Sequence, residues 1–158
     1  MRKTDLDDVL NSMRARYGSL SEPDFSFLHF DEGPVVMDEL RGALKWAEVT
    51  DDTDPDTDVC FSFLVRMGKS QRFLQLSRVG PYACVRVVGH EERYLRRGDA
   101  REPIDEQILA YVDRKDLALL EPELLSVRLP ELHLFATEPE VVAVYHGLFS
   151  DDGRDVSV

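Results

Sequence analysis

Four aspartates at alternate positions form the most regular array of possible metal ligands in this sequence: Asp52, Asp54, Asp56 and Asp58. Calcium-binding loops place carboxylates at every second position in the same way. An EF-hand-type loop also needs a glycine at its sixth position and a bidentate glutamate at its twelfth. Counted from Asp52, these positions hold Thr57 and Phe63. We therefore expect no calcium site and interpret residues 51–58 as a solvated acidic loop, which could also serve as a contact surface for a basic partner.

The four histidines are scattered: His29, His90, His133 and His146. No two of them stand four residues apart, and there is no Cys-x-x-Cys pair, so a zinc site is not expected. The patterns GxSxG, GxxxxGK[ST] and GxGxxG, which indicate a hydrolase nucleophile, a P-loop and a dinucleotide site, do not occur. We expect no metal and no cofactor, and favour a binding protein over an enzyme. A small hydrolase-like enzyme without a recognisable motif remains an alternative.

Two cysteines, Cys60 and Cys84, lie in apolar runs that we interpret as the first and third strands of a meander. Neighbouring strands are about 4.8 Å apart, so these residues are expected to be about 9.6 Å apart. That separation is too large for a disulfide. We predict two buried, reduced thiols, and leave open whether either is reactive.

Charge divides the chain into three blocks within a total of −12. Residues 1–58 hold 6 basic and 15 acidic side chains, residues 59–100 hold 8 and 3, and residues 101–158 hold 5 and 13. A chain with this excess of carboxylates is expected to repel nucleic acid and anionic membranes and to attract basic surfaces. Only the middle block departs from that expectation.

The positive middle block places four arginines on the predicted meander: Arg66, Arg72, Arg78 and Arg86. Projecting from one sheet face, they could bind an anion: a phosphate, a nucleic acid or an acidic partner. Pairing with the acidic flanks is the favoured interpretation, because those flanks carry more than enough carboxylates to neutralise them. A regulatory or adaptor domain that binds an anionic ligand is therefore kept as an alternative function.

Helical spacing of apolar residues predicts a helix over residues 5–17. Pro34 suits the first turn of a second helix, whose apolar stripe extends to Ala47, and Pro103 opens a third over about 104–114. A short helix around 116–125 is also plausible. Six aromatic residues could be either core or contact residues, and core is favoured for most of them: Phe25, Phe27, Phe30, Trp46, Phe135 and Phe149.

The central third changes to the composition of strands. Three runs rich in β-branched and aromatic residues, separated by turn residues, predict an antiparallel meander over about 59–88: 59–67, 71–79 and 82–88. In the first run every second residue is apolar, and this face is expected to be buried: Phe61, Phe63, Val65 and Met67.

Several shorter segments complete the expected fold. Residues 25–30 and 125–129 are predicted to be short strands, and propensity also favours a strand at 141–145. The alternative of a helix within 141–149 stays open, because Thr137 and the residues after it could cap one. The tail after about Asp151 is expected to be loose.

These elements predict an α+β fold in one domain over residues 1–158. An antiparallel sheet of about four to five strands, with the meander at its centre, is expected to pack against N-terminal and C-terminal helices. The first residues have no apolar stretch behind them, so a signal peptide is not expected. No window approaches the roughly 18 apolar residues of a membrane helix. We therefore expect a cytoplasmic protein without membrane contact.

Two segments, together with the small size and the acidity, give the chain a resemblance to bacterial immunity proteins, which neutralise partner toxins: Leu76-Ser77-Arg78-Val79-Gly80-Pro81-Tyr82-Ala83-Cys84-Val85 and Val142-Ala143-Val144-Tyr145-His146-Gly147-Leu148-Phe149-Ser150-Asp151. The resemblance implies a non-catalytic inhibitor that forms a tight complex with a basic toxin domain. An acidic surface would associate quickly with the basic cleft of a toxin that cuts nucleic acid. We expect part of that surface to come from the acidic loop: Asp51, Asp52, Asp54, Asp56 and Asp58.

Overall fold

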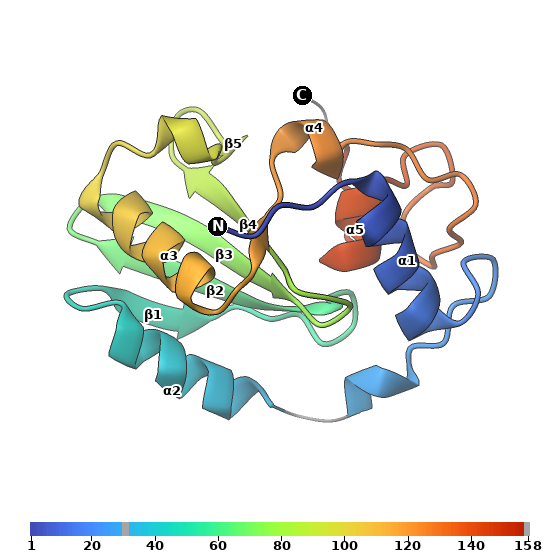
Figure 1. The fold of residues 1–158 in the computed structure, drawn as a ribbon, viewed down its shortest axis with the longest axis horizontal. Helices are drawn as coiled ribbons and strands as arrows, with labels where there is room; N and C mark the ends of the chain where they lie inside the picture. Colours follow the sequence, from blue (N-terminus) through green and yellow to red (C-terminus); the bar gives the residue numbers. More distant parts are fainter. Residues whose placement is uncertain (30–31, 157–158) are drawn as a thin grey trace.

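The computed structural model describes residues 1–29 and 32–156. Its centre is a mostly antiparallel sheet with helices on both sides (Figure 1), so the predicted α+β fold is confirmed. The strands are β1 Glu48–Asp51, β2 Cys60–Met67, β3 Ser70–Ser77, β4 Tyr82–Val88, β5 Arg93–Tyr94 and β6 Ala118–Leu119. The α-helices are α1 Leu6–Tyr17, α2 Gly33–Ala43, α3 Pro103–Arg114, α4 Pro122–Leu125 and α5 Val144–Leu148, and two 3-10 turns are η1 Ser26–His29 and η2 Arg97–Asp99.

The predicted meander is confirmed as β2, β3 and β4, which pair antiparallel in sequence order. Met67 pairs with Ser70, which leaves Gly68 and Lys69 as a two-residue turn. Gly68 has a positive φ of 60°, a conformation that glycine adopts without steric cost. Strand β1 extends the sheet beyond β2, while β5 and β6 both lie along the outer edge of β4.

Side chains point alternately to the two faces of the sheet, and each face forms a separate hydrophobic core. One face of the meander, including Phe63 and Val65, packs against α2 and α3. Phe61 and Met67 lie partly buried at the margin of the same core, so the face predicted to be buried is confirmed. The opposite face contributes Cys60 and other residues to a second core with α1 and α5.

Both cysteines are buried and unbonded, as predicted. Gln75 lies between them on the middle strand: its amide nitrogen lies 3.7 Å from Cys60 Sγ, and Cys84 Sγ lies 3.3 Å from its Oε1. Burial raises the pKa of both thiols, so they are held protonated and away from solvent.

Four predictions about secondary structure are wrong. Residues 26–29 form a 3-10 turn rather than a strand, and Phe30 lies outside the described residues. Residues 125–129 make only an isolated bridge, from Arg128 to Ala143. The favoured strand at 141–145 becomes helix α5 from Val144 onwards. The second helix ends at Ala43, before the end of the predicted stripe, and β1 follows it.

Tertiary contacts explain these differences. Tyr17 holds Phe25 and Phe27 by ring contacts at 5.3 and 5.9 Å, which draws the 3-10 turn onto α1 and away from the sheet. The ring of His146 accepts the backbone N–H of Ala143 at 3.0 Å and so caps the start of α5. The tail is also more tightly held than expected as far as it is described, because Val156 is buried in the second core.

Candidate functional site

The four arginines of the predicted anion site do not share a sheet face. Arg72 is buried beside α3, where its Nε donates to Asp105 Oδ1 at 2.7 Å. Arg66 and Arg86 lie on the other face of the sheet, since they alternate with residues that face α2 and α3. Arg78 lies in the turn between β3 and β4, over the ring of Phe61. The sheet therefore presents no surface on which all four could bind one anion.

Most of the positive block pairs with carboxylates that lie close to it or in the last third of the chain. Arg86 pairs with Glu92 at 3.3 Å, and Arg97 pairs with Asp113 at 2.8 Å. Arg96 pairs with Glu123. Among the residues that the structure describes, no ion pair involves residues 51–58. Within the described part of the chain, no cation therefore neutralises the carboxylates of the acidic loop.

The acidic loop, residues 51–58, is shaped by its own side chains. Asp54 and Asp58 accept backbone N–H groups from Asp56 and Asp54, at 2.9 and 2.8 Å. Asp51, which ends β1, accepts the N–H of Thr53 at 2.9 Å. Such bonds are typical of aspartates that stabilise turns. They leave Asp52 and Asp56 exposed to solvent.

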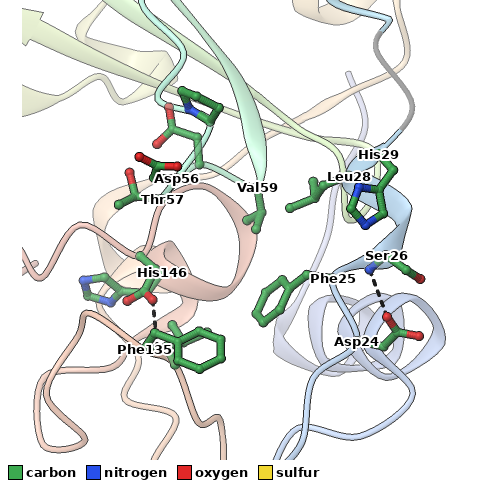
Figure 2. Close-up of a pocket in the computed structure, with 14 residues that line it drawn as sticks. Asp24, Phe25, Ser26, Leu28, His29, Asp56, Thr57, Val59, Phe135 and His146 are labelled. Carbon is green, nitrogen blue, oxygen red and sulfur yellow. Dashed lines mark hydrogen bonds between the residues drawn. The ribbon is translucent and has the colours of Figure 1, made fainter.

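A pocket of about 530 Å³ opens beside this loop. It separates the η1 segment from the end of the acidic loop and from segments near the C-terminus (Figure 2). Its apolar walls are Phe25, Leu28, Val59, Leu134 and Phe135, and its carboxylates are Asp24, Asp56, Asp58 and Asp151. We call this site the acidic pocket. It includes two of the predicted partner-binding residues, Asp56 and Asp58, whereas Asp51, Asp52 and Asp54 lie outside its lining.

Asp151 joins two walls of the acidic pocket. Its carboxylate accepts the backbone N–H groups of Phe135 and Ala136 at 2.9 Å each, and that of Thr137 at 2.7 Å. The Thr137 hydroxyl donates to the same carboxylate at 2.6 Å. The backbone N–H of Asp151 donates to the carbonyl of Thr57 in the acidic loop at 2.8 Å. This residue therefore fixes the turn that carries Phe135 relative to the loop.

The remaining carboxylates of the pocket differ in their surroundings. Burial raises the pKa of Asp58, although hydrogen bonds from Ser150 and Asp54 oppose that effect. The backbone N–H of Ser26 donates to Asp24 at 2.9 Å and lowers the pKa of that carboxyl. A cation that entered the pocket would therefore meet an ionised Asp24. Its charge would also oppose the effect of burial on the pKa of Asp58.

His146 also lines the pocket, but both of its ring nitrogens are engaged. Nδ1 accepts the N–H of Ala143, so the proton resides on Nε2, which donates to the carbonyl of Arg154 at 2.7 Å. Burial lowers the pKa of His146, which favours the neutral ring. This histidine holds α5 and the C-terminal segment together, and it could exchange a proton with a substrate only by breaking one of these contacts.

Acidification from about pH 7.5 to about pH 5.5 is expected to cost up to about 1.4 kcal/mol of unfolding free energy through His146. The unfolded chain protonates this residue near its ordinary pKa, while the folded chain favours the neutral ring. The contribution to stability is therefore complete above the ordinary pKa and is lost as the pH falls below it. Urea unfolding at the two pH values measures the loss.

His146→Asn keeps an acceptor for the N–H of Ala143 and should lack this part of the pH dependence. The exposed residue His133 provides the control, because His133→Asn should behave as the wild type does. An equal pH dependence in the wild type and in His146→Asn would contradict the assignment.

The aromatic wall of the pocket was missed by the sequence analysis, which favoured a core position for most aromatic residues. Phe135 is 94% exposed and Trp46 is 91% exposed, whereas Phe149 is fully buried. Phe25 and Phe135, with ring centroids 6.4 Å apart, come from segments more than 100 residues apart. No local pattern in the sequence signals that meeting.

Comparison of the chain with known protein families, with curated proteins and with solved structures finds no match. Within the described residues, no three or more histidine, cysteine, aspartate or glutamate side chains are grouped so that they could hold a metal ion. None of the helices in the described part of the chain combines the length and apolar character needed to traverse a bilayer.

Proposed function

We propose that this chain is a non-catalytic binding protein that captures a basic protein partner through its acidic loop and the acidic pocket beside it. Following the resemblance to immunity proteins, the proposed partner is a basic toxin domain, which the chain would inhibit by forming a tight complex. The acidic loop supplies the charge that accelerates the encounter, and the pocket supplies the apolar area that retains the partner.

The observation that carries the proposal is the absence, among the described ion pairs, of any internal cation for residues 51–58. An unpaired cluster of carboxylates is held in shape without neutralisation, so its potential extends into solvent. The cluster borders the exposed ring of Phe135. Aromatic side chains are enriched at the centres of protein interfaces, and polar groups surround them at the rim, so Phe135 suits the centre and the carboxylates suit the rim.

Neither alternative function has comparable support. The anionic-ligand alternative needs several arginines on one face, and Arg72 is committed to a buried ion pair while Arg86 is paired at the surface. The hydrolase alternative needs a group that can accept and return a proton. Both ring nitrogens of His146, the buried histidine of the pocket, are engaged in hydrogen bonds, and burial lowers its pKa.

The proposal is tested with four substitutions to asparagine, at Asp52, Asp54, Asp56 and Asp58. Asparagine keeps an acceptor for the backbone N–H groups that shape the loop, so the variant should fold. Immobilised wild-type protein should retain a basic protein from a native lysate at low salt, and that protein should arrest growth unless this chain is expressed with it. The variant should bind the purified partner with an association rate about tenfold lower.

The control variant neutralises four exposed carboxylates elsewhere, with the same change in net charge: Asp7→Asn, Asp38→Asn, Glu91→Gln and Glu106→Gln. Association should stay within about twofold of the wild-type rate, because these groups lie outside the pocket and the loop. The proposal fails if both variants slow association equally, or if the captured protein has no activity that this chain inhibits.

A further inference from the structure

We propose that the acidic pocket is an arginine receptor: the side chain of one arginine of the partner enters it, stacks on Phe135 and pairs with Asp56 and Asp58. The inference rests on the proposed function, because it names the anchor residue for the same acidic surface. The observation behind it is the placement of arginine side chains over phenylalanine rings elsewhere in this chain.

Each of the three described, partly buried phenylalanines outside the pocket has an arginine over its ring. The guanidinium carbon lies 5.2 Å from the centroid of Phe27, 4.9 Å from that of Phe61 and 4.6 Å from that of Phe73. Phe63 and Phe149 are fully buried core residues. Phe25 and Phe135 are the two described phenylalanines that remain, and no cation of the described chain covers either ring.

The geometry of the pocket leaves a place for such a cation. Phe25 and Phe135 point toward one another from opposite sides of the pocket (Figure 2), with 45° between their ring planes. Phe25 therefore occupies one side of Phe135, and the 94% exposure of Phe135 leaves the rest of its ring open to a partner. The volume of about 530 Å³ lies within the usual range for a small-ligand site.

Charge complements this aromatic surface. Four carboxylates line the pocket, and Asp151 among them is engaged by four donors from residues 135–137. Of the other three, Asp56 is exposed, Asp24 accepts the N–H of Ser26, and Asp58 accepts hydrogen bonds from Asp54 and Ser150. None of these three carboxylates has an ion pair among the described residues, so their charge is available to a ligand. A guanidinium satisfies both parts of the site, because it is planar, stacks on aromatic rings and donates several N–H bonds to carboxylates. The lysine ammonium is more strongly hydrated and lacks the planar face.

The test uses three small probes that differ in the head group: the N-acetyl N-methylamides of arginine, lysine and citrulline. Citrulline has nearly the shape of arginine but is neutral. In a two-dimensional NMR titration, the arginine probe should shift the amide signals of Asp56, Asp58 and Phe135. Its dissociation constant should be about tenfold lower than that of citrulline and about threefold lower than that of lysine.

Two substitutions locate the probe. Phe135→Leu keeps an apolar side chain but removes the ring, and should weaken the arginine probe about threefold. Its matched control is Phe73→Leu, which removes a ring that Arg86 already covers outside the pocket, and should change nothing. Equal binding of citrulline and arginine, or an unchanged affinity in Phe135→Leu, would overturn the inference.

The outcomes separate this inference from the proposed function. If the arginine probe fails to bind while the captured partner still depends on the acidic loop, the function stands and the anchor is wrong. If the probe binds as expected but the loop substitutions leave the association rate of the partner unchanged, the arginine receptor stands and the proposed function fails.

Discussion

Asp105→Ala is expected to lower the free energy of unfolding by about 3–5 kcal/mol, because it leaves Arg72 buried without its closest counter-charge. Both side chains are nearly inaccessible, at 5% and 2% exposure, and the Nε to Oδ1 distance is 2.7 Å. Glu102 also pairs with Arg72 at 3.2 Å, but its side chain is half exposed and compensates only in part. Thermal and urea unfolding measure the loss.

The pKa of Asp105 reports the same interaction. Burial alone would raise it, but the bond from Arg72 and backbone N–H groups of the residues before α3 outweigh burial, so the pKa lies below its ordinary value. The stabilisation is therefore complete above the ordinary pKa of the unfolded chain and is lost as the pH falls through the lower, folded value. The wild type should lose this contribution on acidification, whereas Asp105→Ala has none to lose.

The double variant Arg72→Met with Asp105→Ala provides the control. Removing both charges ends the need for compensation, so the double variant should be more stable than Asp105→Ala alone. If the single and double variants are equally unstable, the loss comes from packing or from the capping of α3, and the ion pair is not its source.

Asp151→Ala is expected to lower the free energy of unfolding by about 2–4 kcal/mol, because one carboxylate accepts four hydrogen bonds from residues 135–137. Bonds to a charged acceptor are about twice as strong as neutral ones. Water can reach the N–H groups of Phe135 and Ala136 after the substitution, since both residues are exposed, and this limits the loss. Urea unfolding measures it.

Asp151→Asn distinguishes the acceptor from the volume of the side chain. Each carboxylate oxygen accepts two of the four bonds, so an amide must turn a donor group toward two donors. The asparagine variant should therefore be clearly destabilised despite its similar size. Asp155→Ala is the control, because its ion pair with Arg128 is exposed and worth at most about 1 kcal/mol. Asparagine at 151 with wild-type stability would contradict this role.

The Asp151 variants also bear on function. Without the carboxylate, the turn that carries Phe135 is no longer tied to the segment that bonds the acidic loop. The pocket should lose its fixed aromatic wall, and the arginine probe should bind more weakly in any Asp151 variant that still folds. Stability and binding should therefore decline together here, whereas Phe135→Leu should affect binding alone.

The meander could be predicted because its signals are local. Alternating apolar residues and short glycine-containing turns specify strands and hairpins without help from distant parts of the chain. The same local reasoning placed Cys60 and Cys84 on strands too far apart for a disulfide. It failed at α5, because valine-rich residues 141–145 favour a strand by propensity. There the capping bond from His146 and burial against α1 select a helix.

Local spacing and composition were enough to predict the α+β class, the central sheet and the acidic character of residues 51–58, because each of these depends on single segments. Which charges neutralise one another depends instead on how remote segments pack. The tertiary structure buried Arg72 with Asp105, left the acidic loop without a cation among the described ion pairs, and brought Phe25 to Phe135. Ion pairs and pockets depend on distances between remote residues, and those distances are set when helices pack on the sheet.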